Sequence, residues 1–407
     1  NEELEENILI SKIDKNKNFS LGKPDKCKPA KTKKNLASIN KCEDFDKNDV
    51  KDYSLLIMTD GGTNLKQFAK KMHELQKSSE NQKKMEMFWI EALRLFYGLL
   101  KFNESDIIHY DIKPQNIVYN SETNRLNFID FGFMTTKDNV KSKIKKSDYR
   151  LAIWYWYYPF ENMLLNYNEF INFVNKSLEN KKKLIDSLKE RAIKTDETEH
   201  FSEFYDYIGD DIKSSNDSKF IELLLKIKMN DYKKLIEKSL DSVDSYGLGI
   251  SLYYTLRKTL HLIPDELSDT LKELFENMVT ASMYERYEPE ELIEKYESIL
   301  EDSGLLKKYN FKIREHMAIK KSEPTLLRTI ARTFGLVNSS SSSSENKKTR
   351  KNKPIKKNLT RSQSLSSLSA SSKSSSDPLS SDASSDLLSS DASSDPLSSD
   401  ASSDPLS

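Results

Sequence analysis

Apolar residues recur at helical spacing along most of the chain. The strongest pattern covers residues 85–100, MEMFWIEALRLFYGLL, and predicts an amphipathic or fully buried helix. Residues 1–13 predict a shorter helix in which Leu4 and Ile8 share one face, and acidic residues fill its first turn. A later stretch, residues 162–302, carries several further helical patterns. We therefore expect a largely helical protein.

Short apolar runs between turn residues predict a few strands. Residues 54–59, SLLIMT, precede Asp60-Gly61-Gly62 and predict a buried strand that ends in a turn. Residues 107–120 and 125–133 alternate apolar runs with turn residues, which is typical of a loop between short strands. Residues 14–50 are rich in Lys and Asn and predict loop with short strands. A few strands beside many helices place the expected fold in the α+β class.

The end of the chain has a different composition. Residues 338–407 are rich in Ser, Asp, Lys, Leu and Pro, lack aromatic residues, and cannot bury enough apolar surface to offset chain entropy. We expect a disordered tail. Its basic segment, residues 347–357, suits a nuclear-localisation signal or a nucleic-acid patch, with an unstructured charge run as the alternative. The unit DPLSSDASS recurs from Asp377 and is low-complexity sequence, because it has no face to bury.

The net charge and the cysteine content exclude few classes of protein, but the cysteines indicate the kind of compartment. Lys plus Arg and Asp plus Glu each number 64, so the net charge indicates no particular partner. Cys27 and Cys42 make neither a disulfide framework nor a metal-ligand spacing, which favours a reducing compartment. The longest apolar run, residues 151–165, contains Pro159 and Glu161 and is too short and polar to span a bilayer. No secretory signal peptide is visible.

One segment carries candidate chemistry. His109–Asn116 reads HYDIKPQN, and Asp130–Gly132, DFG, begins fourteen residues after Asn116. Phosphoryl transfer from ATP needs metal ions on the phosphates, charge compensation, and a carboxylate that orients the attacking hydroxyl. Mg²⁺ prefers oxygen ligands, which Asp and Asn side chains supply. The alternative is a polar turn between two strands with an accidental Asp-Phe-Gly.

This arrangement resembles the catalytic loop H-R-D-x-K-x-x-N and the D-F-G of protein kinases, with six fixed positions at the family's spacing. The resemblance implies that Asp111 is the base that accepts the substrate hydroxyl proton. It implies that Lys113 stabilises the γ-phosphate of ATP, and that Asn116 and Asp130 bind Mg²⁺. The expected reaction is transfer of the γ-phosphate to Ser or Thr hydroxyls of a protein substrate.

Segments on both sides fit the same resemblance in the same order. Residues 56–62 resemble the last small-lobe strand and the hinge, although an apolar strand before a turn is the plain alternative. Met58 would be the gatekeeper, and Val118 would form the floor under adenine. The resemblance also packs His109 against Phe131 in the regulatory spine. The implied adenine contacts are Met58, Thr59, Asp60, Gly61 and Val118.

Three downstream features extend the resemblance. Pro159-Phe160-Glu161 resembles the A-P-E motif, and Asp244 resembles the residue that begins the central helix and holds the catalytic-loop backbone. Arg286 stands where the family places an Arg that pairs with the A-P-E glutamate; a solvated charge is the alternative. Residues 168–238 exceed the family's usual connection and predict a helical insertion, with Lys-rich faces that are either solvated or contact an acidic partner.

The resemblance implies a two-lobed kinase fold with a truncated small lobe. Residues 1–62 would form a partial small lobe with the hinge, and residues 63–330 the mostly helical large lobe. No G-x-G-x-x-G and no V-A-I-K segment occur. We expect the strands that carry them to precede residue 1; the alternative is a divergent chain that never had them. Glu6 would then be the helix glutamate that pairs with the missing lysine, with Glu5 as the alternative.

Other departures refine the expectation. Tyr110 replaces the Arg that binds an activation-loop phosphate, so activation is not expected to depend on one. Trp154 replaces the Thr usual in Ser/Thr kinases, although Lys113 still favours Ser/Thr over Tyr. The aromatic run, the reduced small lobe and the insertion are similar to kinases of large DNA viruses.

The expected ligands are ATP, Mg²⁺ and a protein substrate, with no membrane partner and no nucleic acid except through residues 347–357. We expect a cytoplasmic protein, in host cytoplasm or virion if it is viral, with the nucleus as an alternative. A catalytically impaired pseudokinase scaffold that binds partners through the large lobe is the second hypothesis. The third is a small-molecule kinase of the aminoglycoside-phosphotransferase type, which Lys113, Glu161 and Asp244 fit less well.

Overall fold

In a computed structural model, the chain separates into two compact units, residues 1–336 and 337–407. The structure describes residues 2–29, 32, 54–146, 155–183, 207–209, 222–223 and 225–316, all in the first unit. The expected disordered tail, its basic segment, Trp154 and most of the expected insertion lie outside the described residues. Within the described part, no helix has the length and apolar character that crossing a membrane requires.

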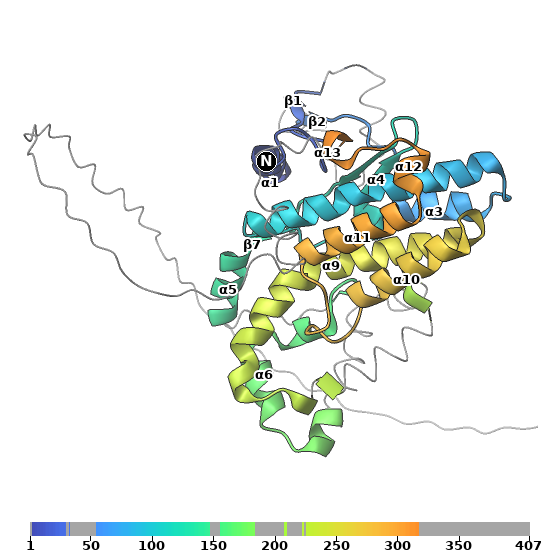
Figure 1. The fold of residues 1–407 in the computed structure, drawn as a ribbon. Coiled ribbons are helices and arrows are strands. Elements are labelled where there is room, and N and C mark those ends of the chain that lie inside the picture. Colours follow the sequence, from blue (N-terminus) through green and yellow to red (C-terminus); the bar gives the residue numbers. More distant parts are fainter. Residues whose placement is uncertain are drawn as a thin grey trace, which may run out of the picture. The chain divides into compact units, whose positions relative to one another are not determined.

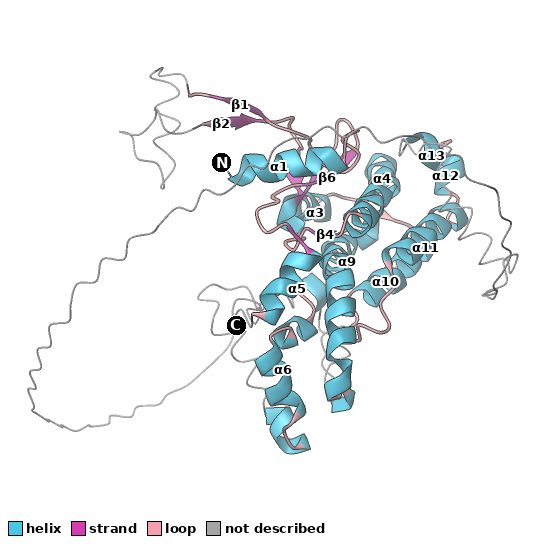
Figure 2. Ribbon diagram, turned by 90° about the vertical axis from the view of Figure 1, so that its left-hand side faces the viewer, coloured by secondary structure: helices cyan, strands magenta, loops and turns pink. Residues whose placement is uncertain are grey.

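Four long helices form the centre of the first unit: α4 (Ser79–Glu104), α9 (Tyr232–Thr259), α10 (Asp265–Met278) and α11 (Pro289–Asp302). Figures 1 and 2 show them side by side, and α9 packs against both α4 and α10. Their facing residues are buried and include Trp89, Phe96, Phe275 and Tyr296, with the rings of Phe96 and Tyr296 stacked 4.4 Å apart. The remaining described helices are α1 (Glu2–Ile13), α3 (Leu65–His73), α5 (Lys137–Lys145), α6 (Tyr167–Val174), α12 (Leu305–Lys308) and α13 (Ile313–His316).

Local sequence explains where these helices begin. The Ser78 hydroxyl accepts a hydrogen bond from the amide of Asn81 at the start of α4, and Asn64 does the same for Gln67 in α3. Helix α11 begins with Pro289 at its first position, where a missing N–H costs nothing. These caps satisfy amides that would otherwise have no partner inside the helix.

In the described part of the chain, three small antiparallel sheets accompany the helices. One contains β3 (Thr63–Asn64), β5 (Ile117–Asn120) and β6 (Arg125–Phe128) in that order. A second pairs β4 (Ile107–Ile108) with β7 (Thr135–Thr136), and a third pairs β1 (Asp25–Cys27) with β2 (Leu55–Ile57). The 3₁₀ turn η2 (Pro114–Asn116) lies between β4 and β5. Mixed helix and small sheets confirm the α+β class.

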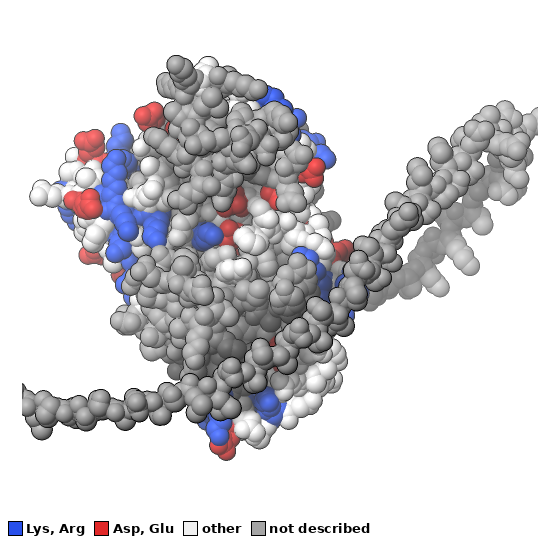
Figure 3. Space-filling model, turned by 180° about the vertical axis from the view of Figure 1, so that it is seen from behind, with Lys and Arg blue, Asp and Glu red and all other residues white. Residues whose placement is uncertain are grey.

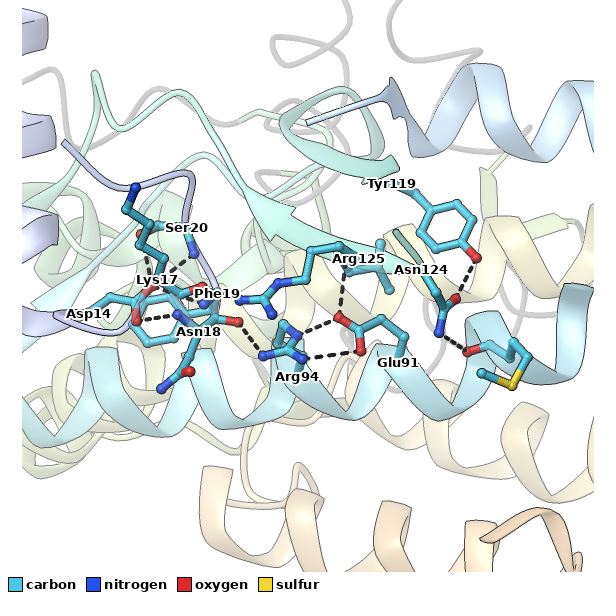
Figure 4. A network of polar contacts seen from close by, with 12 residues as sticks. Asp14, Lys17, Asn18, Phe19, Ser20, Glu91, Arg94, Tyr119, Asn124 and Arg125 are labelled. Atoms are coloured by element: carbon cyan, nitrogen blue, oxygen red, sulfur yellow. Dashed lines mark hydrogen bonds and ion pairs between the residues drawn. The ribbon is translucent and has the colours of Figure 1, made fainter. Parts of the chain in front are cut away.

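The loop that follows α1 is fastened to α4 and β6 by a buried polar network (Figure 4). The Asp14 carboxylate accepts hydrogen bonds from the amides of three residues, Asn18, Phe19 and Ser20. Arg94, paired with Glu91 on α4, donates to the carbonyl of Asn18 at 2.8 Å. Arg125 donates to the carbonyl of Lys17. The backbone of Phe19 joins the sheet through the amide of Phe128 at 2.8 Å.

In α1, Leu4 and Ile8 are both half-buried and Ile10 is buried. Two expectations need correction. The strand in residues 54–59 is not buried: Leu55 and Ile57 are 42% and 57% exposed, because β2 forms a two-stranded ribbon with β1, its described partner. The central helix begins at Tyr232, not at Asp244, so the end of the expected insertion belongs to the same helix.

One lysine of the segment after Gly132 is buried. Lys137 is 8% exposed and donates to the Asp241 carboxylate at 2.7 Å and to Asn103 at 2.5 Å. It lies at the start of α5, where the Thr136 hydroxyl accepts a hydrogen bond from the amide of Asn139. This contact joins the segment after D-F-G to the middle of α9.

Candidate active site

The loop of residues 109–116 is held in place by a carboxylate from α9. Asp244 accepts hydrogen bonds from the amides of His109 at 2.7 Å and Tyr110 at 2.9 Å. These bonds satisfy two buried N–H groups, each of which would cost free energy of folding if it had no acceptor. Burial raises the pKa of Asp244, an effect that the neighbouring His109 and the two amides oppose.

Glycine is required where α9 crosses this loop. A Cβ on Gly247 would lie 2.3 Å from the carbonyl oxygen of Ile112, a distance that no real side chain accepts. The helix backbone therefore contacts the loop backbone directly. Together with Asp244, one turn of α9 determines where the loop lies.

Asp111 and Lys113 lie together, with Asn116 completing the group. Nζ of Lys113 is 2.9 Å from Oδ1 and 3.1 Å from Oδ2 of Asp111. Nδ2 of Asn116 donates to Oδ2 of Asp111 at 2.6 Å and to its carbonyl at 3.0 Å. Both Asn116 bonds use Nδ2, so Oδ1 stays available as a ligand atom. The Asp111 side chain is only 1% exposed.

Asp130 is linked to this group through the residue before it. The amide of Ile129 donates to the carbonyl of Asn116 at 3.0 Å, and Nε2 of His109 lies 3.2 Å from the carbonyl of Ile129. Asp130 has a positive φ of 60°, an uncommon conformation outside glycine that is found at functional sites. It is exposed, and within the described part of the chain its carboxylate has no hydrogen-bond or ion-pair partner.

The donor set suits Mg²⁺ only as a partly protein-bound ion. The described residues include no group of three or more His, Cys, Asp or Glu that would bind a metal. The expected ligands are one carboxylate, Asp130, and one amide oxygen, that of Asn116. Mg²⁺ commonly takes one or two carboxylates and completes its shell with phosphate oxygens and water. The residues present therefore fit an ion that arrives with a nucleotide.

Two buried aromatic residues, Tyr157 and Tyr158, contact the loop of residues 109–116. The ring of Tyr157 lies 5.0 Å from Nζ of Lys113, and Tyr157 is 4% exposed. Burial raises the pKa of Tyr157, and the negative charge of the Asp111 carboxylate raises it further. The Tyr158 hydroxyl donates to the carbonyl of Tyr110 at 2.6 Å. Tyr110 also has a positive φ, of 63°.

His109 and Phe131 pack together, as the resemblance implied, with ring centroids 5.0 Å apart. Phe102 and Phe128 also contact the imidazole ring. Burial lowers the pKa of His109, although the carboxylates of Asp244 and Asp111 oppose the shift. His109 is therefore neutral in this apolar surrounding.

The expected adenine contacts are brought together in part. Gly61 approaches Val118 so closely that a Cβ would lie 2.5 Å from Cγ2 of the valine. Asp60 caps the turn, with Oδ1 2.8 Å from the amide of Gly62. Met58, Thr59 and Asp60 are exposed, Met58 by 36%. Their roles toward adenine stay predictions.

Two further expectations concern ion pairs. Arg286 and Glu161 are in contact, with Nη1–Oε1 at 2.5 Å and Nη2–Oε2 at 3.2 Å, and their side chains are 1% and 0% exposed. The expected pair is present and buried. Glu6 is half-buried on α1, and its pairing with a lysine stays a prediction.

Sequence reasoning missed the aromatic cover. Tyr207 stacks on Trp156 at 4.5 Å with planes 3° apart, contacts Tyr254, and accepts a hydrogen bond from Nε2 of Gln115 at 3.4 Å. The only signal was the aromatic run of residues 154–158. Nothing in the spacing pointed to Tyr207, which lies inside the segment expected to be a charged insertion.

No protein-family model matches this chain, and a search of curated proteins found no match either.

Proposed function

We propose that this protein is a kinase that transfers the γ-phosphate of ATP to Ser or Thr hydroxyls of proteins. One observation carries the proposal: Asp111, Lys113 and Asn116 form a hydrogen-bonded group beside the D-F-G segment. The two-lobed kinase fold and the family resemblance belong to the same proposal. They are supported by Asp244 under the loop and by the Arg286–Glu161 pair.

Each side chain has a stated part in the reaction. The acceptor hydroxyl gives its proton to Asp111 while its oxygen forms a bond to the γ-phosphorus. The bond between that phosphorus and the β–γ bridging oxygen breaks, and ADP leaves with the electron pair. Lys113 offsets charge on the transferred group, and positioning plus electrostatic stabilisation accounts for most of such catalysis.

Metal and nucleotide binding fall to neighbouring residues. Asp130 and Oδ1 of Asn116 would hold Mg²⁺, which supplies charge neutralisation on the phosphates. Gly61 and Val118, which lie in close contact, would lie beside the adenine ring. Lys113 stays paired with Asp111 at 2.9 Å until phosphate competes for it.

The direct test is transfer of labelled phosphate from MgATP to a serine peptide by the full chain. Replacing Asp111→Asn should remove the proton acceptor and lower kcat by about 10²-fold or more. Asp138→Asn is the matched control, because that side chain is 85% exposed on α5. Equal activity in the wild type and the Asp111→Asn protein would overturn the proposal.

A second candidate is a scaffold with impaired catalysis. The observation that favours it is the 1% exposure of the Asp111 side chain, which leaves little access for an acceptor hydroxyl. A scaffold would bind nucleotide or partner without transferring phosphate. Calorimetric titration with MgATP beside the transfer assay separates the two: binding without transfer supports the scaffold.

A further inference from the structure

Basic side chains gather along α3 and the end of α9. The residues of α3, LKQFAKKMH, include three lysines and no acidic side chain. Its buried face is formed by Leu65, Phe68, Ala69 and Met72, so the lysines face outward. Seen from the side opposite to Figure 1, the described surface carries a band of Lys and Arg side chains along one edge (Figure 3).

The end of α9 continues this band. Nδ1 of His73, in the last turn of α3, lies 3.0 Å from the carbonyl of Lys258, which brings the two helix ends together. Lys70 and Lys71 are exposed, and within the described residues neither they nor Lys258 form an ion pair. We call Lys66, Lys70, Lys71, Arg257 and Lys258 the basic band.

The side chain of Tyr207 lies between the start of the basic band and the catalytic loop. Nζ of Lys66 lies 5.8 Å from the ring centroid of Tyr207, and the hydroxyl of that tyrosine accepts a hydrogen bond from Gln115. Gln115 lies between Lys113 and Asn116 in sequence. Lys70 follows Lys66 by one turn, about 6 Å along the axis. An extended peptide covers that distance in about two residues.

We infer that the basic band selects acidic, serine-containing peptides as substrates of the proposed kinase. This inference rests on the proposed function and adds the substrate class. A serine at Asp111 would place a carboxylate a few residues away against the band, where opposite charges attract and steer association. A neutral or basic sequence would gain nothing there.

The chain itself contains a sequence of this class. Residues 377–407 contain seven Asp and no Lys or Arg. Every serine from Ser380 to Ser403 lies within two residues of an Asp. Serine hydroxyls with carboxylates this close in sequence suit a catalytic loop and a basic band that are connected through Tyr207. Serines of this repeat are therefore expected acceptors.

Binding of a labelled peptide tests the inference without depending on catalytic rate. The probe is a fluorescent peptide with the sequence of residues 377–394, and its partner peptide has the four Asp changed to Asn. The receptor is the full chain with the seven Asp of residues 377–407 changed to Asn, so that its own repeat does not compete. Fluorescence anisotropy gives Kd at low and high salt.

The acidic peptide should bind about tenfold more tightly than the Asn peptide at low salt, and salt should reduce the difference. Lys70→Glu with Lys258→Glu should weaken acidic-peptide binding by about fivefold or more. The matched control is Lys233→Glu with Lys312→Glu, because those side chains are 88% and 63% exposed and lie outside the band.

The outcomes separate this inference from the proposed function. Equal affinity for the two peptides, no binding of either, or an equal effect of the control pair would overturn the inference. Phosphate transfer to a neutral serine peptide would still support the kinase in those cases. Selective binding of the acidic peptide without any phosphate transfer would instead support the basic band as a binding surface and contradict the proposed reaction.

Discussion

The ring of Tyr157 lies 5.0 Å from Nζ of Lys113, and the pKa of its hydroxyl is raised by burial and by the carboxylate that Lys113 pairs with, that of Asp111. In the proposed reaction an acceptor hydroxyl would need the same carboxylate, whose side chain is only 1% exposed.

Tyr157→Phe should raise phosphate transfer to a serine peptide. The variant keeps the ring over Lys113 but removes a hydroxyl that interacts with the Asp111 carboxylate, an interaction of about 1.5 kcal/mol at most, so kcat/KM should rise by up to about tenfold. Tyr155→Phe is the control, since Tyr155 is 37% exposed. A fall in kcat/KM for Tyr157→Phe alone would show that the hydroxyl helps the reaction instead of competing with it.

Removing one member of the Glu161–Arg286 pair should destabilise the fold. Arg286→Ala leaves a fully buried carboxylate and three other hydrogen-bond acceptors without their donor, which should lower the free energy of unfolding by about 3–5 kcal/mol. Urea denaturation followed by circular dichroism measures it. The control is Lys272→Ala on the surface of α10, where the side chain is 49% exposed. A loss below about 1 kcal/mol for Arg286→Ala would contradict the burial argument.

The loop after α1 should depend on Arg94. Arg94→Met keeps much of the side-chain volume but leaves Glu91, which is 0% exposed, without its cation and frees the carbonyl of Asn18. We expect a loss of about 3–5 kcal/mol in unfolding free energy. Hydrogen exchange at the amides of Asn18, Phe19 and Ser20 should also speed up. Unchanged exchange there would show that Asp14 alone holds the loop.

His109 should make stability fall at mildly acidic pH. Its pKa lies below the ordinary 6.5 because burial disfavours the imidazolium, so below pH 6.5 the unfolded chain binds a proton that the folded chain does not. The contribution is complete above pH 6.5 and falls by at most about 1.4 kcal/mol per pH unit below it. The pKa of the neighbouring Asp244 is raised, so its contribution to stability grows as the pH falls, opposite to that of His109.

The measurement compares urea denaturation of the wild type and His109→Phe at pH 7.5 and 5.5. The two proteins share Asp244, so the difference between their curves reports chiefly on His109. The wild type should lose more stability than the variant on acidification. Parallel curves would mean that the imidazole takes up a proton in the folded state.

Sequence patterns predicted the parts of the site that are close in sequence or tied by strong constraints. Asp111, Lys113 and Asn116 lie within one loop, so their spacing alone brings them together. Glu161 and Arg286 are 125 positions apart, and the resemblance located them because a buried ion pair demands both partners. Helix α4 followed directly from its apolar spacing.

Other features depended on packing that no local pattern encodes. The SLLIMT run is apolar enough for a buried strand, but burial depends on what covers it, and β2 pairs with β1 in an exposed ribbon. Asp14 is polar yet 2% exposed, since it accepts bonds from the turn that follows. Tyr207 reaches Gln115 only because the chain folds back across 92 residues.

The bond from the His109 amide to Asp244 has a consequence for synthesis on the ribosome. The two residues are separated by 135 positions, and at about 5–20 residues per second the acceptor follows the donor by roughly 7–27 s. During that interval the loop lacks its carboxylate and must stay solvated or be sheltered. Nascent chains arrested before residue 244 should be cleaved by protease near residue 110, and chains that have cleared the exit tunnel past α9 should resist.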